Sequence, residues 1–319
     1  MDAHLFTADL EARPSALGDL QRVLVTDDPW AQVPEEVGQV LFLGMGSSAF
    51  AASVAAARLR ALGVDAVAEL ASSELLPPPD PEQLVVAISA SGGSRETSDA
   101  VAQYAGQSPV MLLTNSAGSA LSAAADHTVL LHAGEERGGV SCRSYTHTQA
   151  LLLALESRLT GADRDLLALL GKVIEASDDL LARRDQWLPA TVDLLAGPDL
   201  TAVVAPFRRL GNAQQSALML REGPRRAAIA SETAEWSHVD VYLTKTLDYR
   251  MLLLPGSRYE DQLLQWTQER GSTVVSVGAD IPGATASVRY RHDDDEDVRT
   301  LTELLVAELV AAELWRASA

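Results

Sequence analysis

The chain has 319 residues, of which 47% are hydrophobic, and its formal net charge is −19 at pH 7. The apolar content supports a sizeable buried core, in one large domain or two medium ones, and excludes a disordered chain. The acidic charge argues against nucleic acid or an anionic membrane as a partner, because both require a basic face on the protein.

Apolar residues at helical intervals predict an N-terminal helix over residues 8–24, with Pro14 near its start. We interpret it as an arm that packs on another surface. After this arm, short apolar runs alternate with longer helical patterns, which is typical of parallel strands covered on both faces. The predicted strands of this half are residues 40–43, 64–68, 84–88, 110–113 and 128–131.

A helical spacer is predicted at residues 163–187, with Pro189 as its break. The second series of predicted strands comprises residues 201–205, 227–230, 250–254, 273–277 and 287–290. The tail, residues 298–315, is predicted to be an amphipathic helix, and the acidic run 293–297 a solvated loop that favours the helix N-terminus. The sequence therefore predicts an α/β fold with two five-stranded units.

The N-terminus and the cysteine content bear on location and cofactors. The first residues lack the basic stretch and apolar run of an export signal, and no apolar run approaches membrane-spanning length, so we expect a cytoplasmic protein with no membrane partner. Cys142 is the single cysteine, which forbids an internal disulfide. Neither it nor the six histidines show metal-ligand spacing, so we expect no metal.

The first candidate motif is Leu43-Gly44-Met45-Gly46-Ser47-Ser48, which follows a predicted strand and opens an alanine-rich helix. Glycines allow a tight turn, and the amides of a helix start together with a serine hydroxyl can bind an anion. A dinucleotide-binding loop is an alternative, but the third glycine expected there is replaced by Ala49 or Phe50 and no ribose-binding acid clearly follows.

The second candidate motif is Ser89-Ala90-Ser91-Gly92-Gly93-Ser94, again between a buried strand and a helix that begins near Arg95. Three hydroxyls at such a turn can surround phosphate oxygens, while the helix dipole favours the negative charge. The alternative is ordinary serine capping of a helix. Two such loops in adjacent strand–helix units favour a ligand site, because ligands of open α/β sheets bind at the carboxyl ends of the strands.

The ordered series of motifs resembles the sugar isomerase (SIS) domain family, in particular the isomerase part of glucosamine-6-phosphate synthase and its stand-alone relatives. The first-half segments that carry this resemblance are Gly46-Ser47-Ser48, Glu69-Leu70-Ala71-Ser72, Ser89-Ala90-Ser91-Gly92 with Ser94, Leu113-Thr114-Asn115, Gly118-Ser119, Ala125-Asp126, and Gly134-Glu135-Glu136 leading to Ser141 and Tyr145-Thr146. The resemblance implies two tandem SIS domains, each a five-stranded parallel sheet flanked by helices. The implied boundaries are a helical arm at 1–35, a first SIS domain at 36–165, a helical linker at 166–198 and a second SIS domain at 199–319.

In this family, hydroxyls of the two loops hold the sugar phosphate, and a serine after the Gly-x-Glu segment touches the sugar. The substrate-binding residues implied by the resemblance are Ser47, Ser48, Ser89, Ser91, Ser94 and Ser141. The sequence departs from the family pattern at two positions of the second loop. Ala90 stands where glutamine is usual, and Gly93 stands where glutamate is usual.

The resemblance also assigns two catalytic residues in the second half. Segment 218–222 resembles the helix whose terminal glutamate moves a proton between C1 and C2 of the sugar, which falls on Glu222, and His238 matches the histidine that helps to open the ring. A carboxylate with a raised pKa suits the first task, and a histidine near neutrality suits the second. Alone, the two residues also fit a solvated helix glutamate and a loop histidine. Met219 replaces a family lysine, and the tail lacks the lysine that the synthase uses for ring opening.

By resemblance, the chain is a phosphosugar aldose–ketose isomerase, or an isomerising deaminase, that acts on a hexose or hexosamine 6-phosphate without a cofactor. A homodimer with a shared active site is implied, because the family histidine comes from the partner. We expect no glutamine-dependent synthesis, since no glutaminase-sized segment precedes residue 39. Two alternatives stay open: a deglycase of phosphorylated sugar–amine adducts, and a non-catalytic phosphosugar sensor that works through a protein partner.

Overall fold

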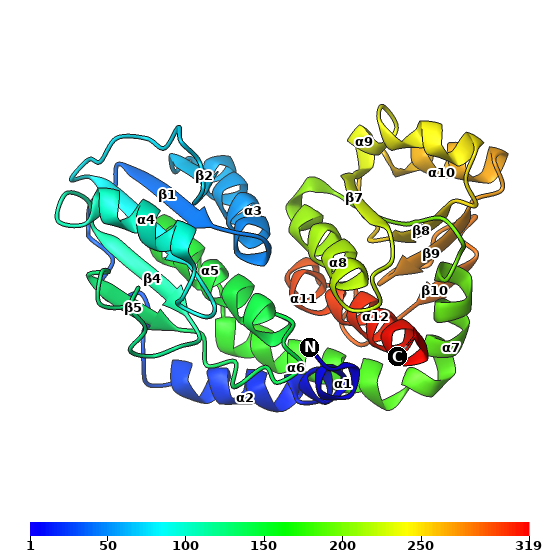
Figure 1. The fold of residues 1–319 in the computed structure, drawn as a ribbon, viewed down its shortest axis with the longest axis horizontal. Helices are drawn as coiled ribbons and strands as arrows, with labels where there is room; N and C mark the ends of the chain where they lie inside the picture. The colour runs from blue at the N-terminus through cyan, green and yellow to red at the C-terminus, as the bar shows by residue number, and fades with distance from the viewer. Residues whose placement is uncertain (319) are drawn as a thin grey trace. The chain divides into compact units, whose positions relative to one another are not determined.

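The computed structural model describes residues 1–318 and divides into two compact units, each built on one parallel sheet (Figure 1). The first-sheet unit consists of Ala16–Glu135 and Arg143–Leu170. The second-sheet unit consists of Met1–Ser15, Glu136–Cys142 and the chain from Gly171 onward. Segment Glu136–Cys142 therefore belongs to the second-sheet unit, although its neighbours in sequence belong to the first.

The first sheet has the strand order β2-β1-β3-β4-β5, with every pair parallel. Its strands are β1 (Gln39–Gly44), β2 (Ala66–Leu70), β3 (Gln83–Ile88), β4 (Val110–Thr114) and β5 (His127–Leu130). The helices of this unit are α2 (Arg13–Leu24, whose first three residues belong to the second-sheet unit), α3 (Ser47–Ala61), α4 (Arg95–Tyr104) and α5 (Arg143–Thr160). The chain turns from β1 to one side to form β2 and then to the other side to form β3. The winding therefore reverses between β1 and β3.

Helices cover both faces of the first sheet, with α3 and α5 on one face and α4 on the other (Figure 1). Leu41, Leu43 and Val85 share a buried cluster with Val101 and Tyr104 of α4. Because side chains alternate along a strand, the residues between them point to the opposite face, and they are buried as well. This double coverage explains why the central strands are continuous apolar runs.

The second sheet has the order β10-β9-β8-β6-β7, again entirely parallel. Its strands are β6 (Thr201–Ala205), β7 (Ala228–Glu232), β8 (Arg250–Leu253), β9 (Thr273–Val277) and β10 (Ala286–Val288). The helices of this unit are α1 (Ala3–Glu11), α6 (Leu166–Ala182, whose first turn belongs to the first-sheet unit), η1 (Phe207–Arg209), α7 (Arg184–Leu195), α8 (Leu210–Glu222), α9 (Thr233–Trp236), η2 (Asp240–Lys245), α10 (Glu260–Glu269), α11 (Glu296–Thr302) and α12 (Leu304–Ser318). Helices α9 and α10 pack on one face, α7 and α8 lie on the other, and α12 packs against α7 and α8 (Figure 1).

All ten predicted strands are present, which confirms an α/β fold with two parallel five-stranded sheets. Two helix predictions were wrong in detail. The predicted helix at 8–24 is two helices, α1 and α2, separated at Ala12. Pro14 is the second residue of α2, where its missing N–H costs nothing, but it could not have continued a helix from α1.

Pro189 does not end the spacer helix; it lies inside α7, and the break falls at Arg183 instead. Proline removes one intrahelical hydrogen bond, but buried side chains on both sides of it, including Trp187, Leu188 and Thr191, hold the helix in place. Tertiary packing thus overrides the local signal.

The C-terminal prediction was also wrong in character. The segment forms two consecutive helices, α11 and α12, and the residues from Leu304 to Ala312 are buried all round, so α12 is a core helix and not an amphipathic one. The acidic run before it is no solvated loop. Asp293 is buried and paired with Arg289, while Asp295 caps α11 by accepting hydrogen bonds from its first amides, which confirms the favourable role at the helix N-terminus.

Among the helices of residues 1–318, none combines the length and apolar character required to cross a membrane.

Candidate functional site

Both serine loops follow neighbouring strands at the point where the first sheet reverses its winding. Gly44, the last residue of β1, lies opposite Ile88, the last residue of β3. The loop from Met45 to Ser48 and the loop from Ser89 to Ser94 therefore leave the sheet side by side. In open α/β sheets this position, outside the carboxyl ends of the strands, is where ligands bind.

The first loop leaves the N-terminus of α3 without a side-chain cap. Gly46 is the capping residue, with a φ of 52°, and it has no side chain to accept the first amides. Ser47 and Ser48 begin the helix, both are half-buried, and within residues 1–318 neither hydroxyl makes a hydrogen bond. The Ser48 amide already donates to the carbonyl oxygen of Met45 at 3.1 Å, so what suits a small anion here is the pair of free hydroxyls at the positive end of the helix dipole.

Gly44 allows α3 to start this close to the strand. A Cβ at this position would lie 2.8 Å from the Cβ of Ser48 and 3.1 Å from the backbone nitrogen of Ala49. Any side chain would push the first turn of α3 away from the end of β1. The glycine therefore fixes where the Ser48 hydroxyl lies relative to the second loop.

Two serine hydroxyls of the second loop already make hydrogen bonds within the loop or with the first turn of α4. Ser94 caps α4, because its Oγ accepts from the backbone nitrogen of Thr97 at 3.2 Å, so the capping interpretation is confirmed for this residue. Its hydroxyl also donates to the Glu96 carboxylate at 3.1 Å. Ser91 Oγ accepts from the Gly93 amide at 3.2 Å, and Ser89 is buried at the end of β3. Ser94 must leave Glu96 before it can donate to a ligand.

Glu96 supplies a negative charge beside this loop. A hydrogen bond from its own backbone amide lowers the pKa of the Glu96 carboxyl, and the bond from Ser94 lowers it further. The carboxylate is therefore ionised at neutral pH. An anion held by Ser94 benefits from the helix dipole of α4 but is opposed by this charge.

Gly92 shapes the second loop from within. Its φ is 64°, and a Cβ there would lie 2.4 Å from Ser119 Oγ and 3.2 Å from Thr114 Oγ1. Ser119 and Thr114, from the next strand and its loop, thus press against the turn. The sequence motifs contained both residues, but only the structure shows that they support the turn.

The predicted proton-transfer residue Glu222 is the last residue of α8, in the second-sheet unit. Its side chain is partly buried and makes no hydrogen bond or ion pair with any other residue in the range 1–318. Burial raises the pKa of the Glu222 carboxyl, and the charge of Arg221 on the same helix only partly offsets this. An unpaired carboxyl with a raised pKa has the properties of a general base.

His238 lies at the other end of the same sheet. It is exposed and follows α9, just beyond the carboxyl end of β7, whereas Glu222 ends the helix that leads into the amino end of β7. The five residues of β7 separate the two ends by about 16 Å. Within one chain, the structure does not bring Glu222 and His238 together.

Ser141 contacts the helix that ends at Glu222. Its carbonyl oxygen accepts a hydrogen bond from Gln215 Nε2 at 2.9 Å, and Gln215 precedes Glu222 by two helical turns on the same face of α8. Ser141 and Glu222 therefore belong to one unit, and the two serine loops belong to the other.

Comparison with known families bears on the first-sheet unit. A family model described as "SIS domain" matches residues 35–158. Segment 35–158 is therefore similar to SIS domains. The matched segment contains both serine loops, from Ser47 to Ser94, but it contains neither Glu222 nor His238.

The chain is also similar in sequence to an aminotransferase that acts on a sugar phosphate. It is 31% identical over 173 residues to the glutamine–fructose-6-phosphate aminotransferase [isomerizing] of Acidithiobacillus ferridurans, an alignment that covers 50% of this chain and 28% of that protein. The chain thus spans less than a third of this relative's length.

Two solved structures share the fold over nearly the whole chain. One is the C-terminal domain of glucosamine-fructose-6-phosphate aminotransferase from Francisella tularensis, with a TM-score of 0.81 and 18% identity over 98% of this chain and 96% of that one. The other is tagatose-6-phosphate ketose/aldose isomerase from Escherichia coli, with a TM-score of 0.79 and 17% identity over 99% and 95%. At these identities the similarity establishes the fold of both units.

Proposed function

We propose that the chain is a phosphosugar aldose–ketose isomerase, or an isomerising deaminase, that acts on a hexose or hexosamine 6-phosphate. The observation that supports this most is the pair of serine loops at the carboxyl ends of β1 and β3, where α3 begins without a side-chain cap. The similarity to a tagatose-6-phosphate isomerase and to an isomerising aminotransferase supports the same substrate class.

The phosphate is anchored by Ser47, Ser48 and the amides at the start of α3, with Ser89, Ser91 and Ser94 from the second loop. No cation is required, because oriented amides and hydroxyls stabilise a dianion at a helix N-terminus. Anchoring the phosphate fixes the position of C1 and C2 and turns the proton transfer into a step within a bound complex. Ser141 contacts the sugar in this proposal.

Glu222 removes the proton next to the sugar carbonyl and returns it to the neighbouring carbon, through an enediol or enediolamine. Its unpaired, partly buried carboxyl supports this role, because a raised pKa makes the carboxylate a stronger base. The arrangement leaves isomerisation, deamination and deglycation open, since all three use the same anchor and a similar proton shuttle.

His238 assists ring opening from a second copy of the chain. The separation of Glu222 and His238 at opposite ends of β7 supports a homodimer in which each site takes its glutamate from one subunit and its histidine from the other. Such a site is incomplete in a single chain.

The first experiment is turnover and binding of fructose, tagatose, glucosamine and galactosamine 6-phosphates by wild type and Glu222→Gln. The variant is expected to keep phosphosugar binding and to lose at least about 100-fold in kcat, the range attributed to general acid–base catalysis. A wild type that binds these compounds without converting any of them, alone or as amine adducts, contradicts catalysis and points to a sensor.

A mixing experiment tests the shared site. Glu222→Gln and His238→Ala homodimers are each expected to be inactive. When mixed and allowed to exchange subunits, they recover up to about a quarter of wild-type activity, because half of the dimers are mixed and each mixed dimer has one intact site. Absence of recovery despite verified subunit exchange contradicts the shared site.

A further inference from the structure

Gly223, the residue directly after Glu222, lies against an aromatic ring of the C-terminal helix. A Cβ at Gly223 would be 2.9 Å from Cε3 and 3.3 Å from Cδ2 of Trp315. The φ of Gly223 is −77°, outside the left-handed region that favours glycine. The close approach of the Trp315 indole therefore explains why this position is a glycine.

A second aromatic side chain holds this indole in place. The rings of Trp315 and Phe6 lie 6.1 Å apart at an angle of 47°, and Phe6 is buried. Phe6 is itself fixed, because its backbone lies 2.5 Å from where a Cβ of Gly138 would be. The end of α8 therefore rests on a ring that has little room to move.

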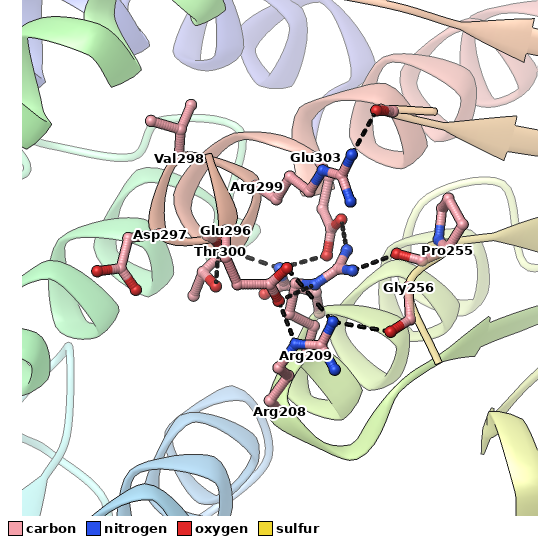
Figure 2. Close-up of polar contacts among 12 residues, drawn as sticks. Arg208, Arg209, Pro255, Gly256, Glu296, Asp297, Val298, Arg299, Thr300 and Glu303 are labelled. Atoms are coloured by element: carbon pink, nitrogen blue, oxygen red, sulfur yellow. Dashed lines mark hydrogen bonds and ion pairs between the residues drawn. The ribbon is translucent and has the colours of Figure 1, made fainter. Parts of the chain in front are cut away.

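The beginning of α8 is fixed to the same C-terminal helices by polar contacts (Figure 2). Asn212 donates to Glu303 Oε1 and to the carbonyl oxygen of Thr300, both at 2.9 Å, and the buried Arg209 pairs with Glu303 and Glu296. Helix α8 is thus held at both ends by α11 and α12. All of these residues lie in the second-sheet unit.

We propose that Trp315 is a positioning residue for Glu222: its indole packs against Gly223, fixes the last turn of α8 and shields the Glu222 carboxylate from water. The inference rests on the proposed function of Glu222 as the proton shuttle. Trp315 touches no reacting atom in this proposal. It acts by excluding water from the carboxylate and by fixing its orientation, as apolar side chains do around other catalytic carboxyl groups.

The charged groups nearby do not replace this effect. The positive charge of Arg221 on α8 stabilises the Glu222 carboxylate and so lowers the pKa of Glu222. On α12, Arg316 is paired with Glu313 at 3.0 Å. Arg226, which follows α8, donates to the carbonyl oxygen of Gly197. Burial is therefore the largest influence on the pKa of the Glu222 carboxyl.

The test compares Trp315→Leu and Trp315→Phe with Trp266→Leu as a matched control. Trp266, on α10, is partly buried in the same unit but stacks on Arg270, the residue that follows α10. The pKa of Glu222 is measured by ¹³C NMR on glutamate-labelled protein, with its signal assigned from Glu222→Gln. Because this readout needs no substrate, it stays informative if the proposed reaction proves wrong.

In Trp315→Leu the pKa of Glu222 is expected to fall by at least about half a unit, with smaller changes in Trp315→Phe and none in Trp266→Leu. If the chain is an isomerase, the acid limb of kcat/KM moves to lower pH by the same amount while affinity for the phosphate is unchanged. An unchanged pKa in a folded Trp315→Leu overturns the proposal.

Gly223→Ala provides a second variant that keeps the indole and displaces it. Its added methyl group is expected to lower the Glu222 pKa as well, since the ring must move to admit it. If Trp315→Leu does not fold, this variant decides. A folded Gly223→Ala with the wild-type pKa contradicts the proposal.

Discussion

The Arg209 guanidinium and the Glu303 carboxylate form an ion pair in which neither side chain is exposed to solvent. The pair lies just beyond the carboxyl ends of β6 and β8, next to Pro255 (Figure 2). By strand order, β6 and β8 correspond to β1 and β3, which carry the serine loops in the first sheet. Arg209 also donates to the carbonyl oxygen of Pro255, and a Cβ at Gly256 would meet its guanidinium at 3.0 Å. In the second unit this position is filled by the protein's own charges.

Arg209→Met is expected to lower the free energy of unfolding by about 3–5 kcal/mol, because it leaves the buried Glu303 without its cation. Urea titrations measure the change. The double variant Arg209→Met/Glu303→Leu is expected to recover most of it. Arg208→Met is the matched control: Arg208 and Glu296 are both partly exposed, so its loss is at most about 1 kcal/mol. Equal losses in the two single variants would contradict this account.

Gly92→Ala is expected to weaken phosphosugar binding at least about 10-fold and to destabilise the protein by about 1–2 kcal/mol. The reasons are its left-handed backbone and the collision of a Cβ with Ser119 Oγ. Gly93→Ala is the control, because Gly93 is exposed and its added Cβ would come no closer than 3.8 Å to Ser91 Oγ. Calorimetric titration separates the two, and similar affinities in both variants would count against the role given to Gly92.

Glu222→Gln is expected to be more stable than wild type at neutral pH. A carboxyl with a raised pKa in the folded state binds its proton more tightly than in the unfolded chain, so the wild type loses stability as pH rises from about 4.3 to the raised value. Glutamine does not titrate and avoids that loss. Unfolding free energies measured from pH 4 to pH 8 should therefore diverge with rising pH. A constant difference would show that Glu222 is not strained by its site.

The sequence was sufficient to predict the strands, but it did not predict where the helices begin and end, because tertiary contacts decide those boundaries. Every residue of runs such as 84–88 and 201–205 is buried. A short, continuous apolar run of this kind is typical of a central parallel strand covered on both faces. The predicted break at Pro189 was wrong because proline locally disfavours a helix, whereas the buried side chains of Trp187 and Leu188 stabilise it here. Local rules do not include such contacts.

The site follows the same division. The glycines and serines at 44–48 and 89–94 predicted a phosphate cradle because loop chemistry is local in sequence. The contacts of Gly223 with Trp315 and of Arg209 with Glu303 join residues about 90 positions apart, and no spacing in the sequence connects them. The acidic run 293–297 was misread only in part for this reason: Glu296 pairs with the distant Arg208 and Arg209, but Arg289, the partner of Asp293, is only four residues away.

The central claim is that the two serine loops jointly hold a phosphate dianion, and a binding titration of Ser48→Ala/Ser89→Ala tests it most directly. The probes are inorganic phosphate and the hexose or hexosamine 6-phosphate that most raises the thermal midpoint of the wild type, with Ser98→Ala on α4 as the control. Wild type and Ser98→Ala should bind the sugar phosphate alike, and the double variant at least about 10-fold more weakly, because each lost bond is to a charged group. Equal affinity in the double variant and the wild type, or no response of the wild type to any phosphate probe, would contradict the account.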